Sequence, residues 1–223
     1  MSPKQIPFDF DHRPALGGED FLVAPSNAQA VAWVERWPHW PAVALAIVGP
    51  RGAGKTHLAH VFQALSNAPV ISISDLRDND ADRVLEGHPA LVLEDVEAFV
   101  RAGLEEKLFH LYNLARESDV KLLLTAETPP SRWAIGLKDL SSRLNTSQVA
   151  EISSPDDALL TALVVKQFAD RQLGVDQDVL TYMLARMDRS FAGVSDLVRA
   201  VDEAALAQKR AITIPLVRKV LEK

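Results

Sequence analysis

Gly49-Pro50-Arg51-Gly52-Ala53-Gly54-Lys55-Thr56 is the stretch of this sequence that decides the fold. It matches the phosphate-binding pattern G-x-x-x-x-G-K-[ST] at every fixed position. The apolar residues 43–48 before it are typical of a strand buried on both faces of a parallel sheet, and residues 57–62 resume at helical spacing. In such a loop, backbone N–H groups surround a polyphosphate, the lysine neutralises its β and γ oxygens, and the hydroxyl reaches Mg²⁺. The sequence therefore predicts a nucleotide site formed by this stretch and His57.

The composition excludes several classes of protein. A chain of 223 residues suffices for one large domain, or for a core with a small second domain. The net charge of −6 gives no global basic field that would attract nucleic acid or an anionic membrane. The absence of cysteine excludes disulfides and thiolate metal sites. Since there is also no apolar run of membrane-spanning length and no signal-peptide core, we predict a cytoplasmic protein without membrane contact.

Strand-like and helix-like segments alternate as far as Ile152, and only helical patterns follow. Strands are expected at residues 43–48, 70–73, 90–93 and 120–125, with Ser74 and Asp75 capping the segment after the second. Helices are expected at residues 28–37, 55–66, 104–117, 156–172, 176–187, 194–209 and 215–222. The predicted fold class is α/β, a three-layer P-loop domain with a parallel sheet followed by a small all-α lid domain. The expected boundaries are a tail over 1–19, the α/β domain over 20–153 and the lid over 154–223.

An acidic pair, Glu94 and Asp95, directly follows the strand expected at 90–93. A phosphate loop needs a second site of this kind, where one carboxylate holds the Mg²⁺ shell and another orients water. We therefore assign Thr56, Glu94 and Asp95 to the metal. The longer Glu94 side chain would crowd an octahedral site, so the sequence favours weak hydrolysis even where binding is tight. The alternative is a pair of surface acids.

Several further segments resemble the AAA+ domain of the bacterial replication initiator DnaA. The phosphate loop, the acidic pair, residues 124–130 (LTAETPP) and residues 139–144 (DLSSRL) occur in that family's order and spacing. Residues 20–27 (DFLVAPSN) also resemble the family's first box, which lines the adenine pocket. The resemblance implies an AAA+ fold, with Val23 and Asn27 contacting the nucleotide and Glu127 at the sensor-1 position.

The same resemblance places Arg143 at the arginine finger, which acts on the nucleotide of a neighbouring subunit. A guanidinium against the γ-phosphate neutralises the charge that develops in the transition state. The alternative is a surface arginine paired with Asp139 one helical turn earlier. The family's sensor-2 arginine is replaced in the lid, where residues 194–197 read VSDL. Arg199 or Arg189 could substitute for it, or both could be solvated helix arginines.

The N-terminal segment contains a short motif of the type that binds another protein. Residues 5–10 (QIPFDF) are similar to the Gln-x-x-[Leu/Phe]-x-Phe peptides that dock on the DNA-polymerase sliding clamp, with Gln5, Ile6, Phe8 and Phe10 as the contacting residues. The alternative is an aromatic staple that folds back on the α/β domain. The chain also ends at Lys223, without the DNA-binding module of DnaA. A shortened DnaA-like chain with such a peptide resembles the Hda/HdaA family of replication regulators.

The resemblance implies a negative regulator of replication initiation. Its ligands would be ADP or ATP with Mg²⁺, and its partners DnaA and the sliding clamp, with DNA contacted only through them. Intrinsic ATPase activity would be weak, and self-association is left open. The alternatives are a self-assembling AAA+ ATPase such as a helicase-loading factor, and a clamp-attached adaptor whose nucleotide is only structural.

Overall fold

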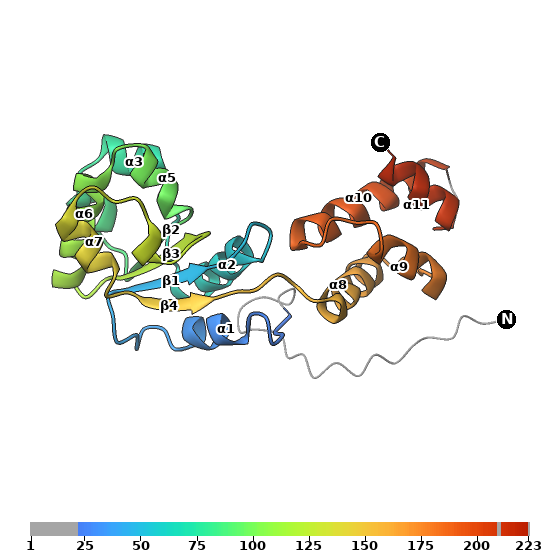
Figure 1. Ribbon diagram of the computed structural model, residues 1–223, viewed down its shortest axis with the longest axis horizontal. Coiled ribbons are helices and arrows are strands. Elements are labelled where there is room, and N and C mark those ends of the chain that lie inside the picture. The colour runs from blue at the N-terminus through green and yellow to red at the C-terminus, as the bar shows by residue number, and fades with distance from the viewer. Residues whose placement is uncertain (1–21, 209–210, 223) are drawn as a thin grey trace. The chain divides into compact units, whose positions relative to one another are not determined.

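The computed structural model describes residues 22–208 and 211–222, which form two compact units (Figure 1). The described parts of these units are residues 22–153 and residues 154–222 without 209–210. Most of the predicted tail, including its clamp-binding residues Gln5, Ile6, Phe8 and Phe10, lies outside the described residues.

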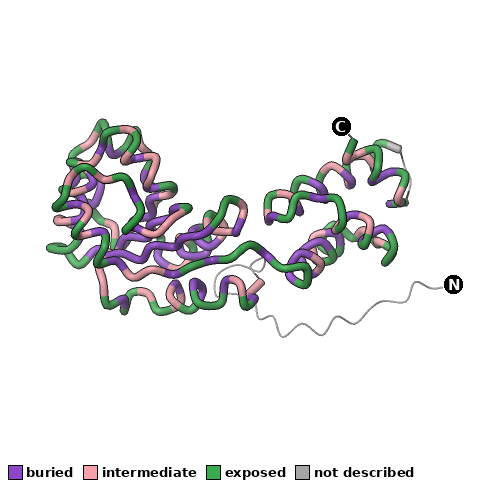
Figure 2. The backbone as a smooth tube through the Cα atoms, in the orientation of Figure 1, coloured by how far each residue is buried: buried purple, intermediate pink, exposed green. Residues whose placement is uncertain are grey.

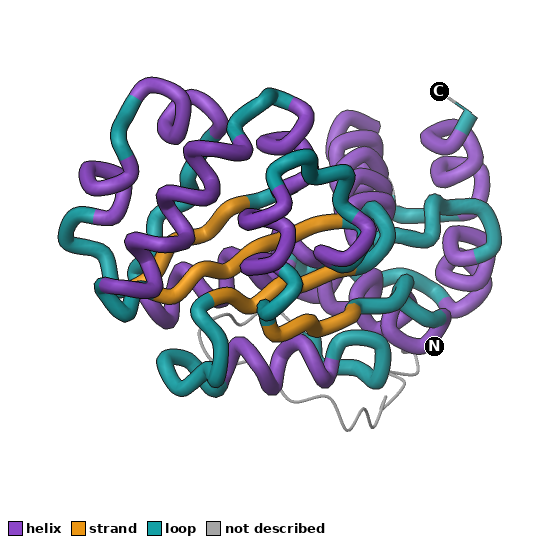
Figure 3. The backbone as a smooth tube through the Cα atoms, turned by 60° about the vertical axis from the view of Figure 1, so that its left-hand side comes forward, coloured by secondary structure: helices purple, strands orange, loops and turns teal. Residues whose placement is uncertain are grey.

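The first unit is built on a parallel four-stranded sheet, drawn in orange in Figure 3, and its strand order is β2-β3-β1-β4. Its strands are β1 (Ala44–Val48), β2 (Ala90–Leu93), β3 (Lys121–Ala126) and β4 (Gln148–Glu151). Every residue of β1 and β2 is buried, as the continuous apolar runs predict. Because the strands are parallel, all their carboxyl ends meet at one edge of the sheet and all their amino ends at the other.

Helices cover both faces of this sheet. Alternate residues of β1 point to opposite faces, so Leu45 and Ile47 pack with α1 (Ala28–Glu35) and α2 (Lys55–Ser66). Ala44, Ala46 and Val48 belong to the core on the other face, with the helices from α3 to α7. Those helices are α3 (Ile73–Asp78), α4 (Ala81–Leu85), α5 (Val96–Arg101), α6 (Glu105–Glu117) and α7 (Lys138–Leu144), with a 3₁₀ turn, η1 (Pro130–Arg132). Figure 2 shows the buried residues concentrated along the strands between these layers.

The strand predicted at residues 70–73 is wrong. Val70 forms only an isolated bridge with Val92, and α3 begins at Ile73. The cap is Ser72, not Ser74: its hydroxyl accepts from the Asp75 N–H at 3.1 Å, and the Asp75 carboxylate accepts from the Ser72 N–H at 2.9 Å. These hydrogen bonds from the Ser72 side chain and backbone also lower the pKa of Asp75. A reciprocal capping box here outweighs the β propensity of the short apolar run.

The described part of the second unit contains four helices, α8 (Asp157–Asp170), α9 (Gln177–Leu184), α10 (Phe191–Gln208) and α11 (Ile214–Leu221). Helices α8 and α11 both pack against α10, and α9 packs against α8 and α11. Helix α10 begins at Phe191, earlier than the predicted residue 194, so Gly193 lies inside its first turn. A side chain there would collide with the Asp188 carbonyl, and the Gly193 N–H donates to the Ser190 hydroxyl at 2.9 Å. The predicted α/β class with an all-α lid is confirmed.

Candidate functional site

The carboxyl edge of the sheet collects most of the predicted site residues. The phosphate loop follows β1, the acidic pair Glu94 and Asp95 follows β2, and Glu127 follows β3. The Thr56 hydroxyl donates to Glu94 at 2.5 Å, which joins two segments 38 residues apart in the chain. The parallel topology thus brings together a loop, a cation and acids that the sequence keeps far apart.

The phosphate loop has the backbone that its glycines allow. Gly52 and Gly54 have φ angles of 77° and 99°, a region that other residues rarely adopt, and Gly54 is the N-cap of α2. A side chain at Gly49 would collide with the Ile152 carbonyl, which follows β4. The loop is therefore held against the sheet at one end, and at the other end opens a helix of 12 residues whose first N–H groups suit an anion.

Lys55 is bound to the loop itself. Its ammonium donates to the carbonyls of Gly49 at 2.8 Å and Pro50 at 2.9 Å. Burial lowers the pKa of Lys55, while the carboxylates of Glu127, Asp95, Glu97 and Glu94 act in the opposite direction. A polyphosphate would offer this cation stronger, negatively charged acceptors than the two carbonyls.

Two of the three predicted metal residues fit Mg²⁺. Thr56 and Glu94 place a hydroxyl and a carboxylate oxygen together, and hard oxygen ligands suit Mg²⁺, which takes its remaining ligands from phosphate and water. Asp95 is engaged elsewhere, because its carboxylate pairs with Arg101 at 3.2 Å. Within residues 22–208 and 211–222, no group of three or more acidic or histidine side chains is arranged to hold a metal by itself.

The backbone at Asp95 is unusual. Its φ of 49° lies in the left-handed region, and its N–H donates to the Thr125 hydroxyl at 3.0 Å. Thr125 is buried at the end of β3, so this bond fixes the acidic turn to the neighbouring strand. Strained backbone of this kind is often found at functional sites.

Asn27 has a role that the sequence did not reveal. It is buried, its amide oxygen accepts from the Ala24 N–H at 2.8 Å, and its amide nitrogen donates to the Leu22 carbonyl at 2.9 Å. The side chain thus shapes the segment that contains Val23. The Ser26 carbonyl accepts from the Ser153 N–H at 3.0 Å, which places this segment beside the residue after Ile152 and near the start of the phosphate loop.

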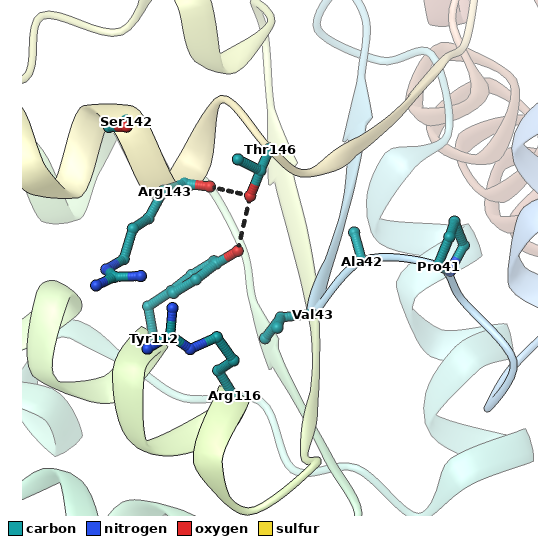
Figure 4. A pocket seen from close by; sticks show the side chains of 8 residues that line it. All are labelled: Pro41, Ala42, Val43, Tyr112, Arg116, Ser142, Arg143 and Thr146. Carbon is teal, nitrogen blue, oxygen red and sulfur yellow. Dashed lines mark hydrogen bonds between the residues drawn. The ribbon is translucent and has the colours of Figure 1, made fainter.

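Arg143 lies at the opposite edge of the sheet. It is near the end of α7, shortly before β4 begins, and it lines a concavity together with Pro41, Ala42 and Val43, which precede β1 (Figure 4). The whole of β1 separates that end from the phosphate loop, a span of about 16 Å for a five-residue strand. Arg143 therefore does not reach the phosphates bound by its own loop.

The guanidinium of Arg143 packs against an aromatic ring and forms no ion pair with a described carboxylate. It lies over the Phe109 ring at 5.5 Å, and its Nε is buried with no hydrogen-bond partner among the described residues. No ion pair with Asp139, the alternative considered from the sequence, forms within the described residues. The chain therefore presents a cation whose charge is not neutralised locally.

Helix α6 holds α7 at both ends. The Glu105 carboxylate accepts from the N–H groups of Gly136 at 3.0 Å and Leu137 at 2.7 Å, at the start of α7. At its end, the Thr146 hydroxyl donates to the Arg143 carbonyl at 2.7 Å and lies 3.1 Å from the Tyr112 hydroxyl. Sequence reasoning missed Glu105 and Tyr112, because their partners lie more than 30 residues away and no local pattern marks them.

The two sensor-2 candidates lie on the lid unit. Arg199 pairs with Asp196 at 2.6 Å, and Arg189 pairs with Asp157 at 2.5 Å. Each arginine thus has a carboxylate partner within the lid, and both are largely exposed. A role of Arg199 at the nucleotide stays a prediction.

Comparison with known proteins shows which fold and which lid family the chain resembles. Domain III of the replication initiation protein DnaA from Thermotoga maritima is similar over 96% of this chain and 98% of that one, with 19% identity and a TM-score of 0.79. Residues 156–221 match the family described as Hda, lid domain. The chain has the fold of DnaA domain III, and its C-terminal segment matches the Hda lid-domain family. The fold and the lid that the resemblance implied are thus confirmed.

Two further solved structures share the fold of this chain. AMPPCP-bound DnaA from Aquifex aeolicus is 18% identical over 82% of this chain and 63% of its own, with a TM-score of 0.67. RuvB from Thermotoga maritima, a Holliday junction branch migration motor, is 18% identical over 88% and 66%, with a TM-score of 0.60. In the described part of the chain, no helix is both long and apolar enough to cross a membrane.

Proposed function

We propose that this protein is a nucleotide-bound negative regulator of chromosomal replication initiation, which stimulates ATP hydrolysis by DnaA with Arg143. The observation that carries the proposal is the placement of Arg143 at the amino edge of the sheet, opposite the phosphate loop. An arginine without a local carboxylate partner, remote from its own nucleotide, suits a γ-phosphate held by another subunit.

The chain's own nucleotide site is better suited to binding a nucleotide than to hydrolysing it. The phosphate loop, Lys55 and the Thr56 and Glu94 pair would bind ADP or ATP with Mg²⁺, as the AMPPCP-bound DnaA relative suggests. Asp95 is paired with Arg101, and Arg143 lies too far away to act in cis. Without a cation on the γ-phosphate, the transition state lacks its main electrostatic support.

The choice of DnaA as partner follows from the shared fold. AAA+ domains that associate head to tail bring the amino edge of one subunit to the carboxyl edge of the next. A chain that superposes on DnaA domain III over 98% of that domain's length could occupy such a position at the end of a DnaA subunit. Its Arg143 would then meet ATP bound by DnaA.

The proposal predicts that DnaA-bound ATP is hydrolysed faster in the presence of this protein. ATP-loaded DnaA is incubated with sliding clamp loaded on DNA, and the ratio of bound ATP to bound ADP is followed with radiolabelled nucleotide. We expect acceleration of at least about tenfold, a small part of what an arginine finger can contribute. No acceleration, by protein shown to be folded and to bind ADP, would contradict the proposal.

The same assay separates the alternatives. A self-assembling ATPase, for which the fold of the RuvB motor is a precedent, would hydrolyse ATP without DnaA and at a specific rate that rises with its own concentration. A clamp adaptor with a structural nucleotide would bind the clamp and leave both ATPase rates unchanged.

Docking on the clamp is tested through the N-terminal peptide. Replacing Gln5 and Phe8 together by alanine is expected to weaken clamp binding at least about a hundredfold, because a few anchoring side chains contribute most of the affinity of such interfaces. Isothermal titration of the full chain with clamp measures the change. Asp9→Ala, at an unrestricted position of the peptide, is the matched control. Equal affinity of the double variant and the control would remove the docking assignment.

A further inference from the structure

The concavity that contains Arg143 has the size of a small-ligand site. Its volume is about 350 Å³, within the usual range for such sites. Residues from α6, from α7 and the turn after it, and from the segment before β1 line it, and Figure 4 shows their side chains: Pro41, Ala42, Val43, Tyr112, Arg116, Ser142, Arg143 and Thr146.

The charges of this concavity are all positive. Arg116 from α6 and Arg143 from α7 both line it, and no carboxylate among the described residues does. Within residues 22–208 and 211–222, neither arginine forms an ion pair. Two like charges that share a hollow repel each other, so an anion placed between them is stabilised by both.

Two hydroxyl groups of the concavity, those of Tyr112 and Thr146, are already committed to each other and to the backbone. Thr146 donates its proton to the Arg143 carbonyl, so the Tyr112 hydroxyl must donate to Thr146. Figure 4 shows this chain of hydrogen bonds, with the Ser142 side chain away from it. Among the side chains that line the concavity, the guanidinium groups of Arg116 and Arg143 and the Ser142 hydroxyl are therefore the donors left for a ligand.

The helices that carry the two arginines are fixed relative to each other. Arg116 lies in the last turn of α6, the helix whose Glu105 and Tyr112 hold both ends of α7. A change in the position of α7 would thus be resisted by the helix that carries Arg116. The backbone positions of the two arginines are thus held in place, as a site for a developing charge requires.

We propose that Arg116 is a second phosphate-binding residue of this edge, which together with Arg143 receives the terminal phosphates of a nucleoside triphosphate held by the neighbouring AAA+ subunit. This inference rests on the proposed function and adds a residue that no sequence pattern indicated. Arg143 neutralises the γ-phosphate, and Arg116 adds a second guanidinium from the side of α6.

The test compares Arg116→Ala, Arg116→Lys and Arg143→Ala in the DnaA hydrolysis assay. Arg77→Ala is the matched control, because Arg77 is also exposed on the first unit and does not line the concavity. We expect Arg116→Ala to lower the maximal stimulated rate about tenfold, as expected for loss of one charge-assisted hydrogen bond. Arg116→Lys should restore most of the rate. ADP affinity and thermal stability of the chain should stay unchanged in every variant.

The outcomes separate the two proposals. If Arg143→Ala abolishes stimulation while Arg116→Ala behaves like Arg77→Ala, the second-arginine inference is overturned and the proposed function stands. If Arg143→Ala keeps full stimulation, the proposed function itself fails. A third arm titrates the chain alone with inorganic phosphate and with pyrophosphate, observed through the arginine side-chain NMR signals. Tight binding there, together with an unchanged rate for Arg116→Ala, would assign the concavity to a free anion and overturn the inference.

Discussion

Replacing Arg143 by alanine is expected to abolish stimulation of DnaA, so that the hydrolysis rate falls to that of DnaA without this protein, because an arginine finger can contribute a factor of about 10³ or more. The physical reason is that the guanidinium would neutralise charge on the transferred phosphoryl group at the subunit boundary, where water is excluded. The effect should be on the maximal rate rather than on complex formation. Single-turnover hydrolysis of DnaA-bound ATP at saturating regulator measures it directly.

The variant should leave the molecule itself intact. Arg143 is partly exposed, forms no ion pair within the described residues and is remote from the phosphate loop, so folding and ADP binding should match those of the natural protein. Asp139→Ala, exposed on the same helix, is the matched control and should keep full stimulation. Stimulation by the Arg143 variant at the natural rate would show that another group completes the DnaA site.

Replacing Lys55 by alanine is expected to weaken nucleotide binding about a hundredfold, corresponding to about 3 kcal/mol for a lost cation at the phosphates. The ammonium already lies on the loop carbonyls of Gly49 and Pro50, so little rearrangement is needed for it to meet a phosphate. ADP and ATP titrations by calorimetry measure the loss.

Thermal unfolding distinguishes a variant that only loses its contact with the nucleotide from one in which the phosphate loop no longer folds. Without nucleotide, Lys55→Ala should melt close to the natural protein, because the site is partly exposed and the two hydrogen bonds contribute only about 1 kcal/mol after screening. With nucleotide, the natural protein should gain stability and the variant should not. Lys138→Ala, exposed at the start of α7, is the control. An equal gain in stability for both variants would remove Lys55 from the phosphate site.

Local sequence patterns predicted much of the fold, because the burial of apolar side chains follows the repeat of a strand or a helix. Continuous apolar runs predicted β1, β2 and β3, and amphipathic spacing predicted α6 and the four lid helices. The exception, residues 70–73, shows the limit of this reasoning. There a serine and an aspartate three positions apart form a helix cap. A prediction based only on the spacing of apolar residues cannot detect such a cap.

The sequence by itself determined the phosphate loop, since glycines, lysine and threonine at fixed spacing have few other uses, and it also determined the α/β class with a helical lid. Only the tertiary structure decided which residues share an edge. The parallel strand order places Thr56 against Glu94 at one end of the sheet and Arg143 beside Arg116 at the other. The physical reason is that strand pairing and helix packing join segments tens of residues apart, and no local pattern encodes such contacts.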